Sequence, residues 1–260
     1  IFRTHQLDGN QGDNVMIDPI LIGLGLFIGT LVGLTGVGGG ALLTPLLILF
    51  AGVKPMTAVG TDLAFAAITK GVGAFQHMRH GKPDLRLVYR LLLGSIPGAI
   101  LGAWLMSALE GINTVNIDAV FTRILGFVLI ISAVASLLRV FNINWIKDNH
   151  MEVGTIGTAV IGGVVGIMVG CTSIGAGSLL MAMISIFFRR LPIAQAVGVD
   201  VAHGAMLAMV AAMAHGAAGR IEVPMVMNLL VGSLPGVLAG SWLCNHLPGR
   251  PLRVGIATML

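Results

Sequence analysis

Charge is scarce in this sequence of 260 residues, because Asp, Glu, Lys and Arg together make up only 10% of it. A soluble domain carries about 25% charged residues, so this chain has too little charge to cover a water-facing surface. Aromatic residues are also few, at 5%, and no basic patch contains interleaved aromatics, which excludes a nucleic-acid-binding protein. The two cysteines, Cys171 and Cys244, lie in apolar segments and do not indicate the redox compartment.

Sequence patterns of known catalytic centres are missing as well. The chain has no Gly-x-Ser-x-Gly turn and no paired His-Glu motif on one helix. Asp200 and His203 are spaced to share one helix face, but two potential ligands do not make a metal site. The sequence therefore predicts neither an enzyme nor a bound cofactor or metal.

Apolar residues, by contrast, make up 56% of the chain, and the mean hydropathy is +0.95. Several apolar stretches approach the roughly 20 residues with which a helix crosses the hydrocarbon core of a bilayer. Glycine is abundant, at 37 residues, and small residues let helices pack closely in a membrane. We therefore expect an all-α integral membrane protein. Its apolar stretches are Ile17–Leu34, Ala58–Met78, Leu87–Leu109, Ala119–Leu138, Val153–Gly170, Ile193–Ala214 and Val223–Leu243.

The chain contains an internal repeat. Glycine-containing motifs of the first half recur in the second half at an offset of 137 or 138 residues, and chance seldom keeps one offset over so long a stretch. We therefore expect a first transmembrane repeat at residues 17–150 and a second at residues 151–260, after a polar tail at residues 1–16. The matched motifs are Gly33–Gly40 with Gly170–Gly177, Val59–Asp62 with Val197–Asp200, and Gly94–Gly98 with Gly232–Gly236.

Each predicted repeat begins with a broken helix. A long apolar helix runs into a glycine-rich break, and a short apolar segment follows at Leu42–Ala51 or Leu179–Phe188. About ten residues of helix are roughly 15 Å long, so this pair forms either a re-entrant hairpin or two crossings. Three transmembrane helices complete each repeat, although the last one is truncated at Leu260. Each repeat then has an odd number of crossings, which inverts the second repeat relative to the first, as in many transporters.

Basic residues are distributed unevenly between the predicted loops. Most lie in one set of loops, whereas the opposite set has little beyond Lys54 and Arg220. Because cytoplasmic loops carry the excess of Lys and Arg, we expect a multi-pass protein of the cytoplasmic (inner) membrane with its N-terminus outside. The predicted cytoplasmic residues are Arg79, Lys82, Arg86, Arg90, Arg139, Lys147, Arg189, Arg190, Arg250 and Arg253.

These motifs resemble those of the TauE/SafE family of sulfite exporters. The resemblance rests on the break Leu34–Gly40, on Ala58–Thr61 and on Gly94–Gly98, and it recurs in the second half. It implies a membrane transporter of sulfite or organosulfonates. Many members of the family have Gly-Thr-Ser where this chain has Gly-Thr-Asp ending at Asp62. The run Ala-Ala-Ile-Thr-Lys ending at Lys70 is similar to that of a subgroup with added acidic and basic residues.

The two glycine breaks are the candidate substrate site. New helices are expected to start near Ala41 and Ser178, and the first N–H groups of a helix bind anions without a charged side chain. Lys70 adds a positive charge deep in Ala58–Met78, which is costly in a membrane unless it has a partner. The alternatives are that the glycines only permit close packing and that Lys70 pairs with Asp62 or reaches the membrane surface. The predicted substrate-binding residues are Thr35, Gly38, Gly39, Gly40, Lys70, Thr172, Ser173, Gly175, Gly177 and Ser178.

Asp62, Asp200 and His203 are the candidate ion-coupling residues. The two acids are equivalent in the repeats, and each lies near the start of a helix that follows a proline. A carboxylate there either caps the helix N-terminus or carries a proton or cation coupled to transport. His203 has no His at its repeat position, whereas His215 lies at a helix end, where we expect a structural role.

The sequence and the resemblance together predict a secondary transporter that moves a small anion, sulfite, a sulfonate or a related sulfur-containing anion, by alternating access. The alternatives are a proton-coupled or metal-cation carrier that uses Asp62, Asp200 and His203, and a passive anion channel. The expected partners are the anionic substrate and the lipid bilayer, and oligomerisation is left open.

Overall fold

The computed structural model describes residues 17–35, 40–80, 83–110, 117–140, 153–188 and 191–246. These residues form nine α-helices and no strand, so the prediction of an all-α chain is confirmed for them. The helices are α1 (Pro19–Thr35), α2 (Gly40–Ala51), α3 (Pro55–His80), α4 (Leu85–Glu110), α5 (Ile117–Val140), α6 (Thr155–Thr172), α7 (Ser178–Phe187), α8 (Ile193–Ala217) and α9 (Val223–His246).

Aspartates and prolines mark where several helices begin. Asp18 precedes α1, and its carboxylate accepts a hydrogen bond from the backbone N–H of Ile20 at 2.8 Å. Asp84 precedes α4 and accepts hydrogen bonds from the N–H groups of Arg86 and Leu87, at 3.0 and 3.2 Å. Such N-caps satisfy donors that the start of a helix leaves unpaired. Proline occupies the first position of α1 and of α3, where its missing N–H is not needed.

Four helices in the described part of the chain are long and apolar enough to cross a membrane. In contrast, α2 and α7 have 12 and 10 residues. They are therefore about 18 and 15 Å long, well short of a hydrocarbon core of roughly 30 Å. Both begin within two residues of the predicted short segments. The four candidate spans are Leu85–Glu110, Thr155–Thr172, Gln195–Ala217 and Val223–Gly240.

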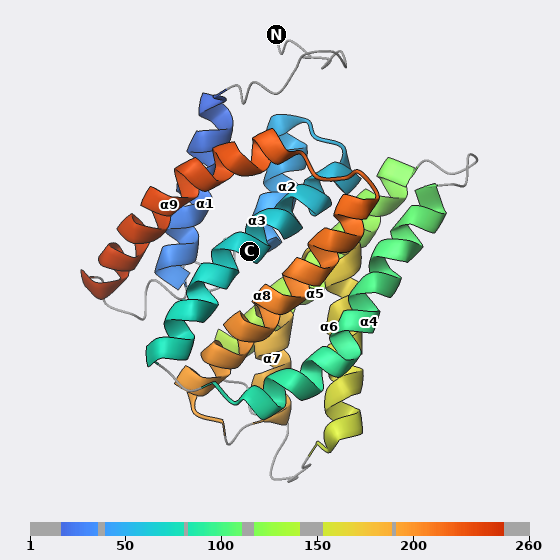
Figure 1. Ribbon diagram of the computed structural model, residues 1–260, viewed down its shortest axis with the longest axis vertical. Coiled ribbons are helices and arrows are strands. Elements are labelled where there is room, and N and C mark those ends of the chain that lie inside the picture. Colours follow the sequence, from blue (N-terminus) through green and yellow to red (C-terminus); the bar gives the residue numbers. More distant parts are fainter. Residues whose placement is uncertain are drawn as a thin grey trace.

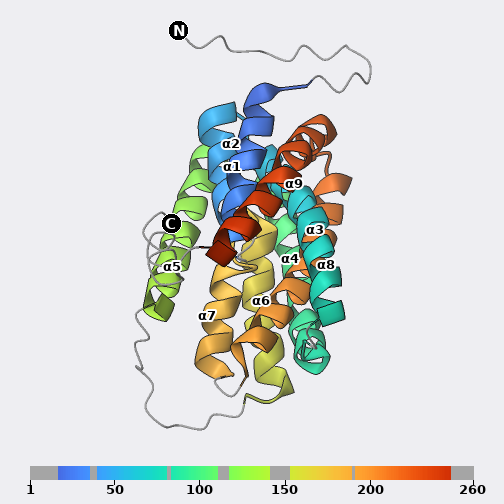
Figure 2. The same cartoon turned by 90° about the vertical axis from the view of Figure 1, so that its left-hand side faces the viewer.

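The helices pack around a central pair. Figure 1 shows α3 and α8 side by side across the middle of the molecule, with α1 against α9 on one side and α4 against α6 on the other. Figure 2 shows α7 between α5 and α8, and α2 packs on α3. Both short helices therefore lie next to the central pair.

Glycines bring the outer helix pairs into backbone contact. A Cβ at Gly166 of α6 would lie 2.7 Å from the Cα of Ser95 in α4, and a Cβ at Gly29 of α1 would lie 2.7 Å from the Cα of Ser233 in α9. Backbone atoms cannot move aside as a flexible side chain can, so both positions require glycine. Close contact through small residues is how helices associate in a membrane, which explains the high glycine content.

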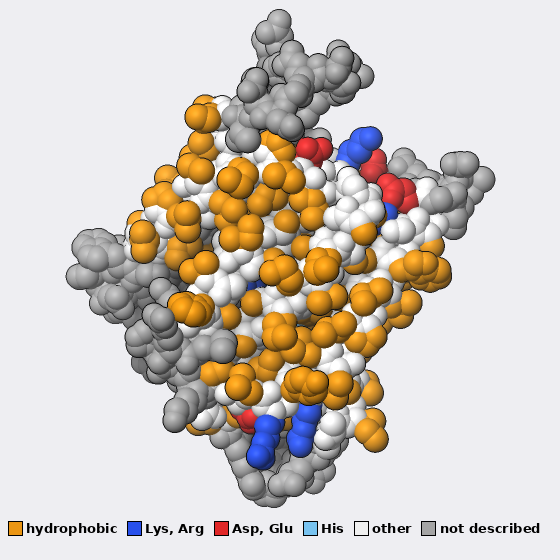
Figure 3. All heavy atoms as spheres, in the orientation of Figure 1, with side chains coloured by type: hydrophobic (Ala, Val, Ile, Leu, Met, Phe, Trp, Pro, Cys, Tyr) orange, Lys and Arg blue, Asp and Glu red, His pale blue; other side chains and the backbone are white. Residues whose placement is uncertain are grey.

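Large apolar side chains cover the flanks of the molecule. Figure 3 shows hydrophobic side chains over the middle of one face, with Lys, Arg, Asp and Glu side chains gathered towards its two ends. Phe75, Trp104 and Phe127 are examples, at 58, 63 and 66% exposed. An apolar surface of this extent is unfavourable in water and is expected of a protein surrounded by lipid.

Candidate functional site

The second glycine break interrupts the chain between α6 and α7. Ser173 follows α6 with a φ angle of 63°, and its N–H donates to the carbonyl of Val169 at 2.8 Å. Gly175 and Gly177 have φ angles of 126° and 155°, which residues with a Cβ rarely adopt. The helix α7 then begins at Ser178. Glycine is therefore required in this break for its backbone conformation, independently of helix packing.

The first glycine break precedes α2, which begins at Gly40. Gly38 and Gly39 lie outside the described residues, and so does the side chain of Thr35 at the end of α1. The role of these residues in a substrate site stays a prediction.

Lys70 extends from α3 across α8 to the second break. Its ammonium group donates a hydrogen bond to the carbonyl oxygen of Ala176, two residues before α7 begins. The side chain crosses α8 at Gly204, where an added Cβ would lie 2.9 Å from Lys70 Nζ and 3.3 Å from its Cδ. The missing side chain of Gly204 therefore makes room for the crossing. Lys70 is directed to the break and not along its helix to the membrane surface.

Asp62 lies on the same helix and is fully buried. The hydroxyl of Thr44 in α2 donates to Asp62 Oδ2 at 2.5 Å, and Ser173 of the second break lies next to the same carboxylate. Asp62 Oδ1 has no hydrogen-bond partner among the described residues. Leaving a buried carboxylate oxygen unpaired is costly, so this oxygen is a candidate to bind a proton or another ligand.

The helix-capping role considered for Asp62 and Asp200 is wrong. The helix α3 begins at Pro55 and α8 begins at Ile193, so each acid lies seven residues beyond the start of its helix. The unpaired N–H groups that a cap satisfies are confined to the first turn. Both carboxylates are therefore too far along their helices to serve as caps.

Asp200 and His203 face Lys70 from α8. Asp200 is 4% exposed and His203 is fully buried. The charges of Asp200 and Asp62 both act on the Lys70 ammonium, and Lys70 in turn acts on His203. His203 Nε2 shares a hydrogen bond of 2.8 Å with the hydroxyl of Ser95 in α4, and its Nδ1 has no partner among the described residues. We refer to Lys70, Asp62, Asp200 and His203 as the Lys70 cluster.

Two of the predicted hydroxyl donors already have partners within the protein. Thr172 donates to the carbonyl of Met168 at 2.8 Å, within α6. Ser178 shares a hydrogen bond with Ser132 of α5. Ser173, by contrast, has a buried hydroxyl without a hydrogen-bond partner in the part of the chain that the structure describes. Of these three residues, Ser173 is the one whose hydroxyl is available beside the Lys70 cluster.

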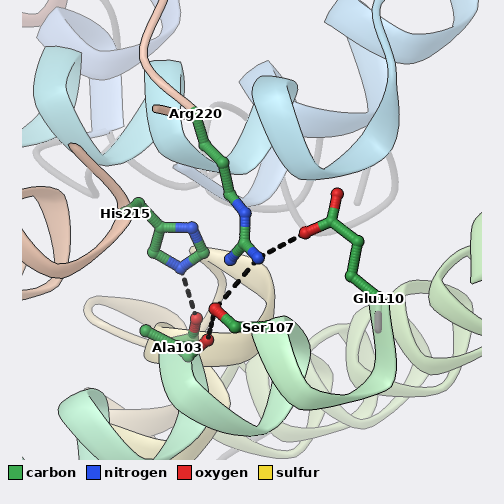
Figure 4. A network of polar contacts seen from close by, with 6 residues as sticks. Ala103, Ser107, Glu110, His215 and Arg220 are labelled. Carbon is green, nitrogen blue, oxygen red and sulfur yellow. Dashed lines mark hydrogen bonds and ion pairs between the residues drawn. The ribbon is translucent and has the colours of Figure 1, made fainter. Parts of the chain in front are cut away.

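A second polar network ties the end of α8 and the loop after it to α4 and α6 (Figure 4). Arg220 is 6% exposed, and its Nη2 forms an ion pair with Glu110 at 2.5 Å and donates to Ser107 at 2.9 Å. His215 Nε2 donates to the carbonyl of Gly170 at 2.8 Å, two residues before α6 ends. These contacts connect segments more than 40 residues apart, and no sequence pattern indicates them.

Gly204 is a site residue that sequence reasoning missed, although the repeat contains a signal for it. Lys70 occurs where the second repeat has Ala208, and Gly204 occurs where the first repeat has Ala66. Lys70 and Gly204 each differ from the alanine at the equivalent position of the other repeat, and the two residues lie against each other in the structure. Two positions at which the repeats differ in side-chain size in opposite directions can therefore indicate a contact between them.

An all-helical chain with an apolar surface, two short helices and a buried charged cluster beside a glycine break has the features of a membrane transporter. The chain belongs to the family described as Sulfite exporter TauE/SafE, whose model matches residues 21–260. It is a membrane transporter and not an enzyme.

Two relatives from Bacillus subtilis (strain 168) illustrate the similarity. The probable membrane transporter protein YjnA is 39% identical over 245 residues, covering 92% of this chain and 95% of the relative. The probable membrane transporter protein YdhB is 28% identical over 242 residues, covering 91% and 95%. No solved structure matches the chain.

Proposed function

We propose that the chain is a secondary transporter that carries a small anion, namely sulfite, a sulfonate or a related sulfur-containing anion, across the cytoplasmic membrane by alternating access. The observation that carries the proposal is the position of Lys70, whose ammonium reaches the second break directly before α7. The description of the family as sulfite exporters supports a sulfur-containing anion as the substrate.

The proposed anion site combines the Lys70 ammonium with the start of α7. The first N–H groups of a helix carry partial positive charge and bind anions. A cation inside a membrane protein needs a partner, and the carbonyl of Ala176 is one partner of Lys70 in this structure. We propose that the substrate anion takes the place of this carbonyl. The proposed site comprises Lys70, Thr172, Ser173, Gly175, Gly177 and Ser178, together with Thr35, Gly38, Gly39 and Gly40 of the first break.

The packing of the helices supports two inverted repeats, at residues 17–150 and 151–260. An added Cβ at Gly29 would lie 2.7 Å from the Cα of Ser233, and one at its counterpart Gly166 would lie 2.7 Å from the Cα of Ser95, the counterpart of Ser233. The first helices of the two halves, α1 and α6, run in opposite directions in Figure 1, and the counterparts α3 and α8 pair with each other. Rocking one half against the other would expose the Lys70 cluster to each side of the membrane in turn.

The positions of the basic residues support a cytoplasmic-membrane protein with its N-terminus outside. Arg86 and Arg90 lie at the start of α4, next to the end of α3. Lys54 precedes α3 at its other end, and the backbone of Arg220 contacts Gly60 near that same end. We assign the end with Arg86 and Arg90 to the cytoplasm, because the larger number of basic loop residues is on that side.

The main alternative is a proton-coupled or metal-cation carrier that uses Asp62, Asp200 and His203. All three residues are close enough to the Lys70 ammonium to interact with its charge. A cationic substrate would be repelled by that charge in a region of low dielectric constant. The Lys70 ammonium and the start of α7 therefore favour an anion as the substrate bound at the second break. A passive anion channel is the other alternative.

Uptake into proteoliposomes that contain the purified protein separates the three functions. A carrier should exchange labelled sulfite outside for unlabelled sulfite inside and accumulate the label transiently, because alternating access couples the two fluxes. A channel gives only equilibration, without this transient accumulation. Uptake of a labelled divalent cation in the absence of sulfite uptake would support the cation carrier and contradict the proposal.

A further inference from the structure

The Lys70 cluster contains one half-buried basic side chain and two buried acidic side chains. Asp62 and Asp200 are 0% and 4% exposed, and both act electrostatically on Lys70. With both acids ionised and His203 neutral, the net charge of the cluster is −1, and a monovalent anion would make it −2. Uncompensated charge is costly in a region of low dielectric constant. The cluster therefore needs an additional positive charge whenever it accepts an anion.

We propose that this positive charge is a proton, so that each monovalent anion binds together with one proton taken up by the carboxylate pair Asp62 and Asp200. This inference rests on the proposed anion transport and adds to it the coupled ion and the coupling ratio. In the empty cluster the two carboxylates hold one proton, Lys70 is charged, and the net charge is zero. When the anion binds Lys70, the second carboxylate takes a proton from a hydronium ion on the open side. One O–H bond of the hydronium ion breaks and leaves water, one carboxylic O–H bond forms, and the cluster is again neutral.

The hydrogen bonds around Asp62 are compatible with this uptake. Asp62 Oδ1 has no partner among the described residues and can carry a proton while Oδ2 keeps the hydroxyl of Thr44, and the Ser173 hydroxyl lies beside the same carboxylate. His203 is a poorer proton acceptor, since a second cation would then lie beside the Lys70 ammonium. The groups that face the carboxylate pair are Lys70 on α3, His203 on α8, Thr44 on α2 and Ser173 in the break, with Ser95 on α4 behind His203.

A metal cation such as sodium fits the cluster less well than a proton. It would be repelled by the charge of the Lys70 ammonium, on which both acids act. A metal ion also needs several oxygen ligands around it, whereas a proton needs one carboxylate oxygen. Coupling by a proton therefore requires no further ligands around the cluster.

Isothermal titration calorimetry of the purified protein with methanesulfonate measures the proposed ratio. Methanesulfonate is a strong-acid anion and takes up no proton itself near neutral pH. Titrations in buffers of different ionisation enthalpy give the number of protons taken up for each anion bound. We expect one proton per anion, and a dissociation constant that falls about tenfold for each unit by which the pH is lowered. Anion binding with no proton uptake would overturn the inference and leave the proposed transport intact.

Substitution of the acids tests whether the proton is taken up by these two carboxylates, either of which can accept it. Asp62→Asn or Asp200→Asn alone leaves one carboxylate beside Lys70, so each single variant should still take up one proton. The double variant Asp62→Asn/Asp200→Asn has no acid left in the cluster and should bind the anion without a proton. Asp118→Asn, at an exposed acid of α5, is the matched control and should behave like the wild type.

Proteoliposomes give a second readout that does not depend on the variants. Coupled one to one, uptake of methanesulfonate should be driven by a pH gradient, acid outside, and should not change when a membrane potential is imposed. Uptake that follows the membrane potential and moves no proton, detected with a pH-sensitive dye inside the vesicles, would overturn the inference. Absence of both binding and uptake of methanesulfonate and sulfite would overturn the proposed function itself, and the inference with it.

Discussion

Two single glycine-to-alanine substitutions in α6 should change the stability of the protein in opposite directions, one through the contact between α6 and α4 and the other through helix propensity alone. At Gly166 a new Cβ would lie 2.7 Å from the Cα and 2.8 Å from the carbonyl carbon of Ser95, whereas at Gly163 the nearest atom is 3.7 Å away, on Gly94. Backbone atoms cannot rotate aside, so Gly166→Ala must push α6 away from α4. Such overpacking costs about 1–3 kcal/mol. Gly163→Ala introduces no overlap and gains up to about 1 kcal/mol from helix propensity.

The two variants should therefore differ by about 1–4 kcal/mol in the free energy of unfolding. For a chain of this length, that difference corresponds to roughly 2–16 °C in melting temperature. Thermal unfolding in detergent can be followed in a Cys244→Ser background by the reaction of a thiol dye with Cys171, which is buried in the folded protein. Equal melting temperatures of Gly166→Ala and Gly163→Ala would refute the idea that backbone contact between α4 and α6 requires glycine at Gly166.

Gly204→Ala would crowd the Lys70 ammonium and should raise the half-saturation concentration for labelled sulfite about tenfold, whereas Gly71→Ala, with no atom within 4 Å, should not change it. Glu110→Gln removes the ion-pair partner of a buried guanidinium. Because the Glu110 side chain is 52% exposed, we expect a loss of about 1 kcal/mol, seen as a decrease of about 2–4 °C in melting temperature. Single cysteines at positions 54 and 86, in a cysteine-free background, should react with an impermeant thiol reagent from opposite sides of the membrane, and labelling from one side would contradict the inverted topology.

The helical fold and the two short helices are predictable from the sequence because they depend on composition and on local residues. Apolar runs indicate helices, and the glycines before Ser178 indicate a break between two of them. The pairing of α1 with α9 and of α4 with α6 is less accessible, since it depends on contacts between distant segments. Gly29 and Gly166 are visible in the sequence, but their partners Ser233 and Ser95 are not.

The candidate site is predictable only in part. Lys70 is conspicuous as an ionisable residue in an apolar helix, yet its contact with Ala176 spans 106 residues and depends on how α3 crosses α8. The capping role considered for Asp62 fails because α3 begins at Pro55, earlier than the apolar run from Ala58 indicates. The Thr44 hydroxyl that binds Asp62 comes from α2, and no local spacing rule relates residues of two different helices.

The half-saturation concentration for labelled sulfite in proteoliposomes, compared between the wild type, Lys70→Arg and Lys70→Ala, tests most directly whether Lys70 holds the anion. We expect Lys70→Ala to raise it by about 10- to 100-fold, since a hydrogen bond to a charged group contributes about 1.5–3 kcal/mol. Lys70→Arg keeps the positive charge and should raise it less, and Lys54→Ala, at an exposed lysine before α3, should leave it unchanged. Equal values for the wild type, Lys70→Arg and Lys70→Ala would contradict the assignment of Lys70 to the anion site.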